Sequence, residues 1–191
     1  MNQDQLQALL TKVQQGALAV PDALHRLRTL PYENLGFASL DHHRALRQGF
    51  PEVIFCEGKT VSQVVAIAKT LLRKNNALLA TRVEPSVARA LLRVSKRAVY
   101  HEAARVVAIA PPKLVRRGAV LIVTAGTADI PVAEEARVTA DIMGSKTDTL
   151  YDVGVAGLHR LLGQQERLHD ARALIVVAGM DGVLPSVVGG L

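Results

Sequence analysis

Strands that alternate with helices fill the second half of this chain, and they constrain its fold more than any other feature. The strands are predicted at residues 119–126, 148–154 and 173–179, and the helices at residues 132–144 and 158–171. Apolar strands that alternate with helices are typical of a parallel sheet with helices on both faces. We therefore predict a doubly wound, flavodoxin-like α/β domain in this half.

Ligands of such sheets bind beyond the carboxyl ends of the strands. In this chain those ends are expected at residues 124–129, 152–157 and 179–182. The segment from residue 119 to residue 191 is shorter than a usual domain of this kind, which has roughly 100 to 150 residues. We therefore expect the sheet to be incomplete in this chain. Either another subunit completes it or, as we favour, the chain is truncated.

The whole chain is predicted to have four segments. Leucines at helical spacing indicate a helical hairpin at the start, and two prolines, charged residues and a glycine (PPKLVRRG) are typical of a linker. The segments are a helical hairpin (residues 1–30), a small mixed α/β domain (31–110), the linker (111–118) and the partial doubly wound domain (119–191).

The mixed domain is expected to alternate short strands with helices. Strands are predicted at residues 51–58 and 78–83, with one or two more at residues 98–110. Thr60 or Ser62 can cap one helix, and Pro85 can open the next.

The composition excludes several classes of protein. A single Cys excludes a fold held by disulfides within the chain, and no apolar run reaches the roughly 18 residues of a membrane span. The first residues also lack the basic and then apolar pattern of a signal peptide. We therefore expect a cytoplasmic protein.

The formal charge of +6 is unevenly distributed. Residues 1–118 hold 18 basic and 8 acidic side chains, whereas residues 119–191 hold 5 basic and 9 acidic ones. A basic half favours a phosphorylated ligand or nucleic acid, but aromatic residues make up only 3% of the chain, and residues 89–97 are interpreted as a solvated helix face. We therefore expect a small anionic substrate, with neither nucleic acid nor a membrane as partner.

Each of the three turns that follow the predicted strands brings a carboxylate to the same edge of the sheet. The first turn places Thr127 and Asp129 just before a helix, where backbone N–H groups and the helix dipole can hold an anion. The second contains Asp152 and His159, and the third contains Asp181. Each feature alone also fits an ordinary turn or helix cap, but their convergence favours a ligand site. The candidate substrate-binding residues of this edge are Thr124, Gly126, Thr127, Asp129, Gly154, Val155, Gly179 and Met180, and the candidate catalytic residues are Asp181, Asp152 and His159.

The first half offers weaker candidates. Four cations, Arg44, Arg47, Lys59 and Arg82, either form a cationic wall for phosphates or carboxylates or are scattered surface charges. The adjacent His42 and His43 point differently on any regular element, so we expect no metal site from them and assign no metal ligands. Cys56 lies in an apolar strand and is expected to be a buried, inert thiol.

Long motifs in both halves resemble one known family. They are GFPEVIFCEGKT, the TR at residues 81 and 82, VTAGTADIPVAEEA, YDVGVAGLHR and VVAGMDGVLPSVVGG. Together they resemble the LarB family, the pyridinium-3,5-biscarboxylic acid mononucleotide synthases of nickel-pincer nucleotide cofactor biosynthesis. The second half is in turn similar to the PurE-like carboxyaminoimidazole ribonucleotide mutase fold.

This resemblance implies a carboxylase and hydrolase. The substrate would be nicotinic acid adenine dinucleotide, the co-substrate CO2 or bicarbonate, and AMP a product, with Mg2+ as a candidate cofactor. A Cys nucleophile would add to carbon 4 of the pyridinium so that carbon 5 can attack CO2. Asp181 or Asp152 would then accept the ring proton. The resemblance also implies a homo-oligomer, since mutase relatives are octamers.

The nucleophilic Cys of the family lies beyond SVVGGL, and Cys56 does not occupy its position. We therefore expect this chain to keep part of the substrate site and to lack turnover. Two alternatives stay open. One is a carboxyaminoimidazole ribonucleotide mutase of purine (IMP) biosynthesis, although true mutases have no basic N-terminal domain. The other is a non-catalytic nucleotide-binding module.

Overall fold

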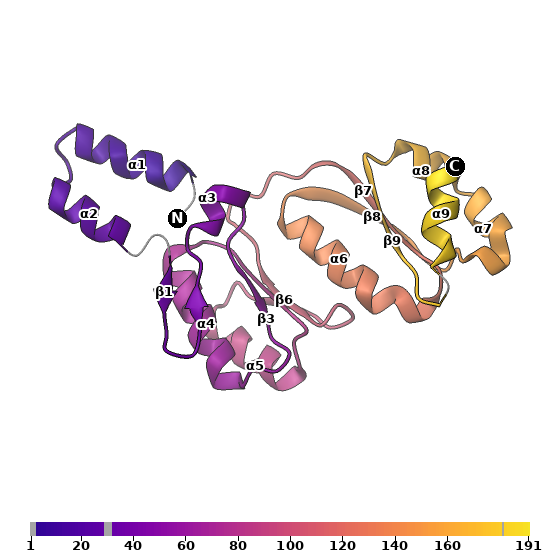
Figure 1. Ribbon diagram of the computed structural model, residues 1–191, viewed down its shortest axis with the longest axis horizontal. Helices are drawn as coiled ribbons and strands as arrows, with labels where there is room; N and C mark the ends of the chain where they lie inside the picture. Colours follow the sequence, from indigo (N-terminus) through magenta and orange to yellow (C-terminus); the bar gives the residue numbers. More distant parts are fainter. Residues whose placement is uncertain (1–2, 29–31, 181) are drawn as a thin grey trace. The chain divides into compact units, whose positions relative to one another are not determined.

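The computed structural model describes residues 3–28, 32–180 and 182–191 (Figure 1). The chain divides into two compact units, Met1–Val99 and Tyr100–Leu191. The predicted α/β class is confirmed, because N-terminal helices precede a small mixed sheet and then a parallel three-stranded sheet with flanking helices. The segment limits predicted from the sequence stay predictions.

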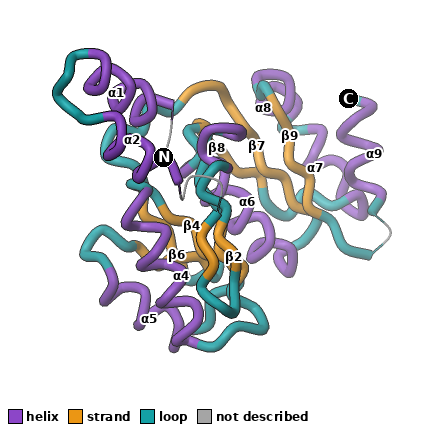
Figure 2. Tube along the Cα trace, turned by 60° about the vertical axis from the view of Figure 1, so that its left-hand side comes forward, coloured by secondary structure: helices purple, strands orange, loops and turns teal. Residues whose placement is uncertain are grey.

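The first unit begins with two helices that lie side by side, α1 (Gln3–Gln14) and α2 (Val20–Arg28) (Figures 1 and 2). Leu9 and Ala23 are buried, whereas Leu10 and Leu24 are more than half exposed. The described parts of the predicted hairpin are therefore helical, but they bury few apolar side chains.

Short strands and helices follow. From residue 51 onward they appear in the order that the sequence predicts, whereas the three short elements between residues 33 and 48 were not predicted. The elements are β1 (Glu33–Asn34), β2 (Ser39–Leu40), α3 (Arg44–Gln48), β3 (Val53–Phe55), α4 (Val61–Lys74), β4 (Leu78–Thr81), α5 (Pro85–Val94), β5 (Val99–His101) and β6 (Val106–Ile109). β1 pairs antiparallel with β2, and β3 pairs in parallel with β4. Thr60 caps α4, because its hydroxyl accepts the N–H of Gln63 while the Gln63 side chain accepts the N–H of Thr60.

His42 is buried in the first unit and makes the stability of the protein sensitive to pH. Its Nε2 lies 3.1 Å from Oε2 of Glu33, while its Nδ1 has no hydrogen-bond partner among the described residues. Burial, followed by the charge of Lys74, lowers the pKa of His42 below 6.5, although the hydrogen bond and charge of Glu33 act in the opposite direction. The neutral ring is therefore the form that the fold favours.

We expect the free energy of unfolding to decrease as the pH falls below about 6.5. The reason is that His42 in the unfolded protein then takes up a proton, whereas the buried ring, whose pKa is lower, stays neutral to a lower pH. Urea unfolding of the wild type and of His42→Gln, measured between about pH 7.5 and pH 5, tests this. The variant should lose less stability over that range than the wild type. His101, whose pKa is also lowered, is present in both proteins and drops out of the difference. Parallel pH profiles would contradict the role of His42.

The second unit is built on a parallel sheet of order β8-β7-β9. Its strands are β7 (Arg117–Thr124), β8 (Ser145–Leu150) and β9 (Ala173–Val177). One helix, α6 (Ile130–Ile142), covers one face. The opposite face is covered by α7 (Leu158–Leu162), α8 (Gln165–Asp170) and α9 (Val183–Gly190) (Figures 1 and 2). The predicted sheet with helices on both faces is thus confirmed.

The core under α7, α8 and α9 explains why these elements pack together. It consists of the buried side chains Leu121, Val123, Leu150, Val153, Leu161, Leu168, Leu184 and Val188. Leu121 and Val123 alternate along β7, so the intervening Ile122, also buried, lies on the α6 face. Burial of one such side chain contributes about 1.5 to 3 kcal/mol.

Two predicted elements differ from those observed. The strand predicted at residues 148–154 is instead β8, which begins at Ser145 after Gly144 (φ 94°) and ends at Leu150. It cannot continue to residue 154, because Asp152 has a φ of 60°. The helix predicted at residues 158–171 is divided into α7 and α8 near Gly163.

Candidate functional site

The turns that follow β7, β8 and β9 meet at one pocket of about 370 Å³, which we call the rim pocket. Parallel strands end at the same edge of a sheet, so their turns converge there. The lining residues are Ala125, Gly126, Ala128 and Asp129 after β7; Gly154, Val155, Ala156 and Arg160 after β8; and Ala178, Gly179, Met180, Gly182, Val183 and Leu184 after β9. Small and apolar side chains dominate this lining, and among the lining residues that the structure describes the charged ones are Asp129 and Arg160.

Asp129 braces the first turn. Its Oδ2 accepts the N–H of Gly126 at 2.8 Å, within the short 3₁₀ helix η1 (Thr127–Asp129). A Cβ at Gly179 would lie 3.7 Å from Oδ1 of the same carboxylate. Asp129 therefore lies between the first and third turns, while Thr127 is exposed beside it.

Thr124 lies beneath the pocket. It is fully buried at the end of β7, where its Oγ1 accepts the N–H of Asp152 at 3.0 Å and its carbonyl accepts the N–H of Val153 at 3.0 Å. Among the predicted substrate-binding residues, Thr124 thus joins the first turn to the second, and its side chain faces protein.

An ion pair spans the second turn. Nη1 of Arg160 donates to Oδ2 of Asp152 at 2.6 Å, and both side chains are partly exposed. The guanidinium occupies space that glycine leaves free, because a Cβ at Gly157 would lie 2.6 Å from Nε of Arg160. A cation at the mouth of an apolar pocket can exchange its carboxylate partner for a phosphate or carboxylate of a ligand.

The three predicted catalytic residues have different positions. Asp152 is not among the described residues that line the rim pocket but pairs with Arg160, which does line it, whereas His159 is exposed on α7. Asp181 lies outside the described residues. His159 was among the residues predicted from the sequence and Arg160 was not, although the motif LHR contains both.

Met180 and the glycines of the third turn leave the pocket open. Met180 is fully exposed and has a φ of 40°, and Gly182 has a φ of 62°. Both positions have left-handed backbone, which glycine adopts without steric cost. A large apolar side chain thus stands in solvent at the entrance.

The four cations predicted as a wall in the first unit are not all on the same element, and Arg47 and Lys59 contact different partners. Arg47 pairs with Asp41 at 2.5 Å, and Nη1 of Arg47 lies 3.1 Å from Nδ1 of His43. Lys59 donates from Nζ to the carbonyl of Phe55 at 2.7 Å, while Arg82 follows β4 with a φ of 55°. Arg44 begins α3. A role of these four cations in substrate binding stays a prediction.

Cys56 is a buried thiol, as the sequence predicts. It is 4% exposed, and burial raises the pKa of its thiol to about 11. At neutral pH the side chain is therefore almost entirely the unreactive thiol.

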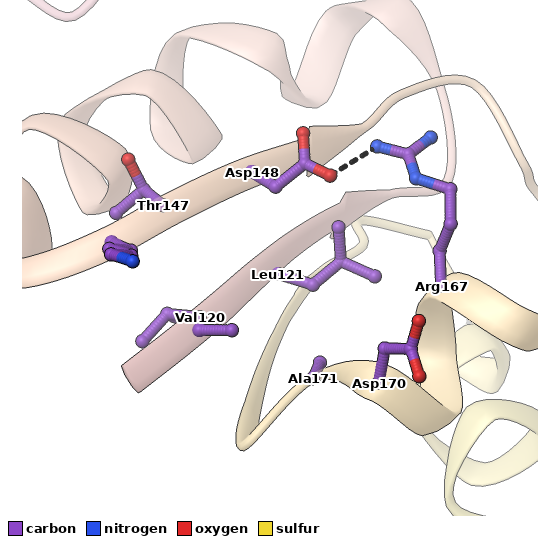
Figure 3. Close-up of a pocket in the computed structure, with 9 residues that line it drawn as sticks. Val120, Leu121, Thr147, Asp148, Arg167, Asp170 and Ala171 are labelled. Atoms are coloured by element: carbon purple, nitrogen blue, oxygen red, sulfur yellow. Dashed lines mark hydrogen bonds and ion pairs between the residues drawn. The ribbon is translucent and has the colours of Figure 1, made fainter. Parts of the chain in front are cut away.

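A second, smaller pocket of about 190 Å³ opens near the amino-terminal ends of the strands (Figure 3). Its apolar floor includes Val120 and Leu121 of β7, and Asp148 of β8 faces Arg167 of α8 across it. Arg167 donates to Oδ2 of Asp148 at 2.7 Å and to the carbonyl of Thr149 at 2.8 Å. The guanidinium of Arg167 is therefore already engaged by partners within the protein.

Two features are absent over residues 3–28, 32–180 and 182–191. There, no three His, Cys, Asp or Glu side chains are grouped so that they could hold a metal ion. In the same ranges, no helix has both the length and the apolar character needed to cross a membrane.

Fold and pocket together define an α/β protein with a ligand-sized cavity at the carboxyl edge of a parallel sheet. Residues 32–111 match the LarB/PurE-like N-terminal domain. The chain is also 34% identical over 197 residues to the "Uncharacterized protein MJ0165" of Methanocaldococcus jannaschii, in an alignment covering 97% of this chain and 77% of that protein. The chain therefore belongs to the same family as this archaeal protein, with a LarB/PurE-like N-terminal domain.

Proposed function

We propose that the rim pocket binds nicotinic acid adenine dinucleotide, and that the chain belongs to a carboxylase and hydrolase of the LarB type. The observation on which this proposal depends is the Asp152–Arg160 pair at the mouth of an apolar, glycine-lined pocket. The apolar lining suits a planar pyridinium ring, and Arg160 suits its carboxylate or a phosphate. The LarB/PurE-like match of residues 32–111 supports the same reaction class.

In the proposed reaction, a thiolate adds to carbon 4 of the pyridinium and turns the ring into an enamine. Carbon 5 then forms a bond to CO2, a base removes the proton from carbon 5, and loss of the thiolate restores the pyridinium. Hydrolysis of the phosphoanhydride by water releases AMP and leaves the dicarboxylated mononucleotide. In this proposal Asp152 accepts the proton and Arg160 holds the incoming carboxylate, and the ion pair between the two side chains supports both roles.

The single Cys of the chain does not suit the nucleophilic role. Cys56 belongs to the first unit, is buried, and has a pKa of about 11, whereas a nucleophile needs an accessible thiolate. We therefore propose that these 191 residues bind the substrate and do not complete the reaction. Mg2+ assistance in the hydrolysis and assembly into a homo-oligomer belong to the same proposal. Exposed Leu158, Leu162 and Val183 on α7 and α9 are apolar surfaces that a second copy could cover.

A titration with two ligands tests the proposed substrate. Isothermal calorimetry should show saturable binding of nicotinic acid adenine dinucleotide, at least about tenfold tighter than binding of aminoimidazole ribonucleotide. Incubation of the same protein with nicotinic acid adenine dinucleotide, bicarbonate and Mg2+ should release no AMP. It should also form no product that is about 44 Da heavier than nicotinic acid mononucleotide. A preference for the aminoimidazole ribonucleotide would favour a mutase. Turnover by the 191 residues would contradict the proposed lack of a nucleophile.

A further inference from the structure

Asp152 owes its position at the rim pocket to an unusual backbone conformation. Its φ of 60° lies in the left-handed region, which residues other than glycine rarely adopt. Aspartate tolerates this region better than most residues, but such a conformation persists only where the surroundings hold it. The contacts of the Tyr151–Asp152 turn are therefore the features that decide where the Asp152 carboxylate lies.

Two elements hold this turn from opposite sides. On the side of β7, Oγ1 of Thr124 accepts the N–H of Asp152 at 3.0 Å, and the carbonyl of Ala125 accepts the N–H of Gly154 at 2.8 Å. On the side of α6, the Tyr151 hydroxyl donates to Oε1 of Glu134 at 2.5 Å. A side chain from α6 thus anchors the residue immediately before Asp152.

Glu134 is itself held in place. Nε of Arg137 donates to its Oε1 at 2.8 Å, and Nη2 of Arg137 donates to its Oε2 at 2.8 Å. The hydrogen bond from Arg137 is the main cause that lowers the pKa of Glu134, and the side chain is only 17% exposed. Burial, followed by the hydrogen bond to Glu134, raises the pKa of Tyr151 to about 12. At neutral pH a protonated hydroxyl therefore faces a fixed carboxylate.

We propose that Tyr151 and Glu134 are positioning residues, which hold the strained turn so that Asp152 pairs with Arg160 at the mouth of the rim pocket. Neither is among the described residues that line the pocket. They hold the backbone of Asp152. Its carboxylate in turn holds the guanidinium of Arg160, whose Nη1 donates to Oδ2 of Asp152 at 2.6 Å. This role rests on the proposed function only in so far as Arg160 receives the anion of the substrate.

Amide hydrogen exchange of the ligand-free protein tests the anchoring by itself. Tyr151→Phe removes only the hydroxyl, and it should speed exchange at residues 152–154 by about tenfold, because one strong hydrogen bond no longer restrains the turn. Tyr32→Phe, which makes the same change at a side chain 63% exposed in the first unit, should leave this exchange unchanged. If Tyr151→Phe fails to fold, Glu134→Gln keeps an acceptor oxygen and should speed the same amides less. Unchanged exchange at residues 152–154 would overturn the proposal.

A double-mutant cycle separates positioning from a general structural role. In titrations with nicotinic acid adenine dinucleotide, Tyr151→Phe should weaken binding about tenfold in the wild-type background. It should have almost no effect in Asp152→Asn, because Asn tolerates the left-handed backbone but has no charge to pair with Arg160. Equal losses in both backgrounds would overturn the role through Asp152. If the wild type binds no dinucleotide while Tyr151→Phe still speeds exchange at residues 152–154, the proposed substrate is wrong and the positioning role stands.

Discussion

Replacement of Arg160 by Ala should weaken the binding of nicotinic acid adenine dinucleotide on the order of 100-fold, the largest change that we expect from a single substitution at the rim. Two effects add in the same direction. The ligand loses a charge-assisted hydrogen bond, and the Asp152 carboxylate, 2.6 Å from the guanidinium in the structure, is left unpaired next to an anion. Calorimetric titration measures the change.

The loss should be specific to the rim. Arg172→Ala removes another exposed arginine of the same unit, immediately before β9 and so at the opposite end of the sheet, and should leave the dissociation constant unchanged. The melting temperature of Arg160→Ala should shift little, because an ion pair between partly exposed groups contributes about 0 to 1 kcal/mol. Equal affinities of Arg160→Ala and the wild type would exclude Arg160 from the ligand site.

Replacement of Gly154 by Ala should disturb both stability and binding. An added Cβ would lie 2.7 Å from the carbonyl oxygen of Ala125, which is closer than real Cβ atoms approach. The added Cβ would be fixed to the backbone of residue 154, and the oxygen it meets is also backbone, so no side chain can move to make room. The N–H of Gly154 donates to that same carbonyl at 2.8 Å, so the first and second turns would have to separate. We expect a loss of about 1 to 3 kcal/mol in the free energy of unfolding. Dinucleotide binding should weaken at the same time.

Gly163→Ala provides the matched control. Its backbone is helical, with a φ of −66°, and an added Cβ would meet its nearest atom, the carbonyl of His159, at an ordinary 3.4 Å. This variant should be as stable as the wild type or up to about 1 kcal/mol more stable. Urea unfolding of the wild type and both variants measures the free energy of unfolding. Equal stability of Gly154→Ala and the wild type would contradict the prediction, because it would show that the turns can move apart at little cost.

The sequence predicted the architecture of the second unit because its strands and helices have strong, regular patterns. The apolar run before Thr124 and the helix predicted at residues 132–144 appear close to where the periodicity places them, the helix as α6 (Ile130–Ile142). The polar strand was misplaced by three to four residues, since Ser145–Leu150 alternates polar side chains and resembles a loop by composition. Only the structure shows that Asp152 leaves the strand conformation.

The candidate site was predictable in its location and less so in its contacts. Three turns at the carboxyl edge follow from the topology of parallel strands, so the position of the rim pocket follows from the sequence. The partner of Asp152 does not, because the pairing with Arg160 depends on space left by Gly157. Nor does any local pattern connect Glu134 with Tyr151, which lie 17 residues apart on different elements.

Mapping of the bound dinucleotide by hydrogen exchange tests the central claim most directly. The 191-residue protein is compared with and without saturating nicotinic acid adenine dinucleotide. We predict slower exchange in the three turns of the rim pocket, at residues 125–129, 152–157 and 178–184, with little change elsewhere. Protection confined to the turns after β3 and β4, at residues 56–60 and 82–85, or no protection at all, would contradict a nucleotide site at the rim of the parallel sheet.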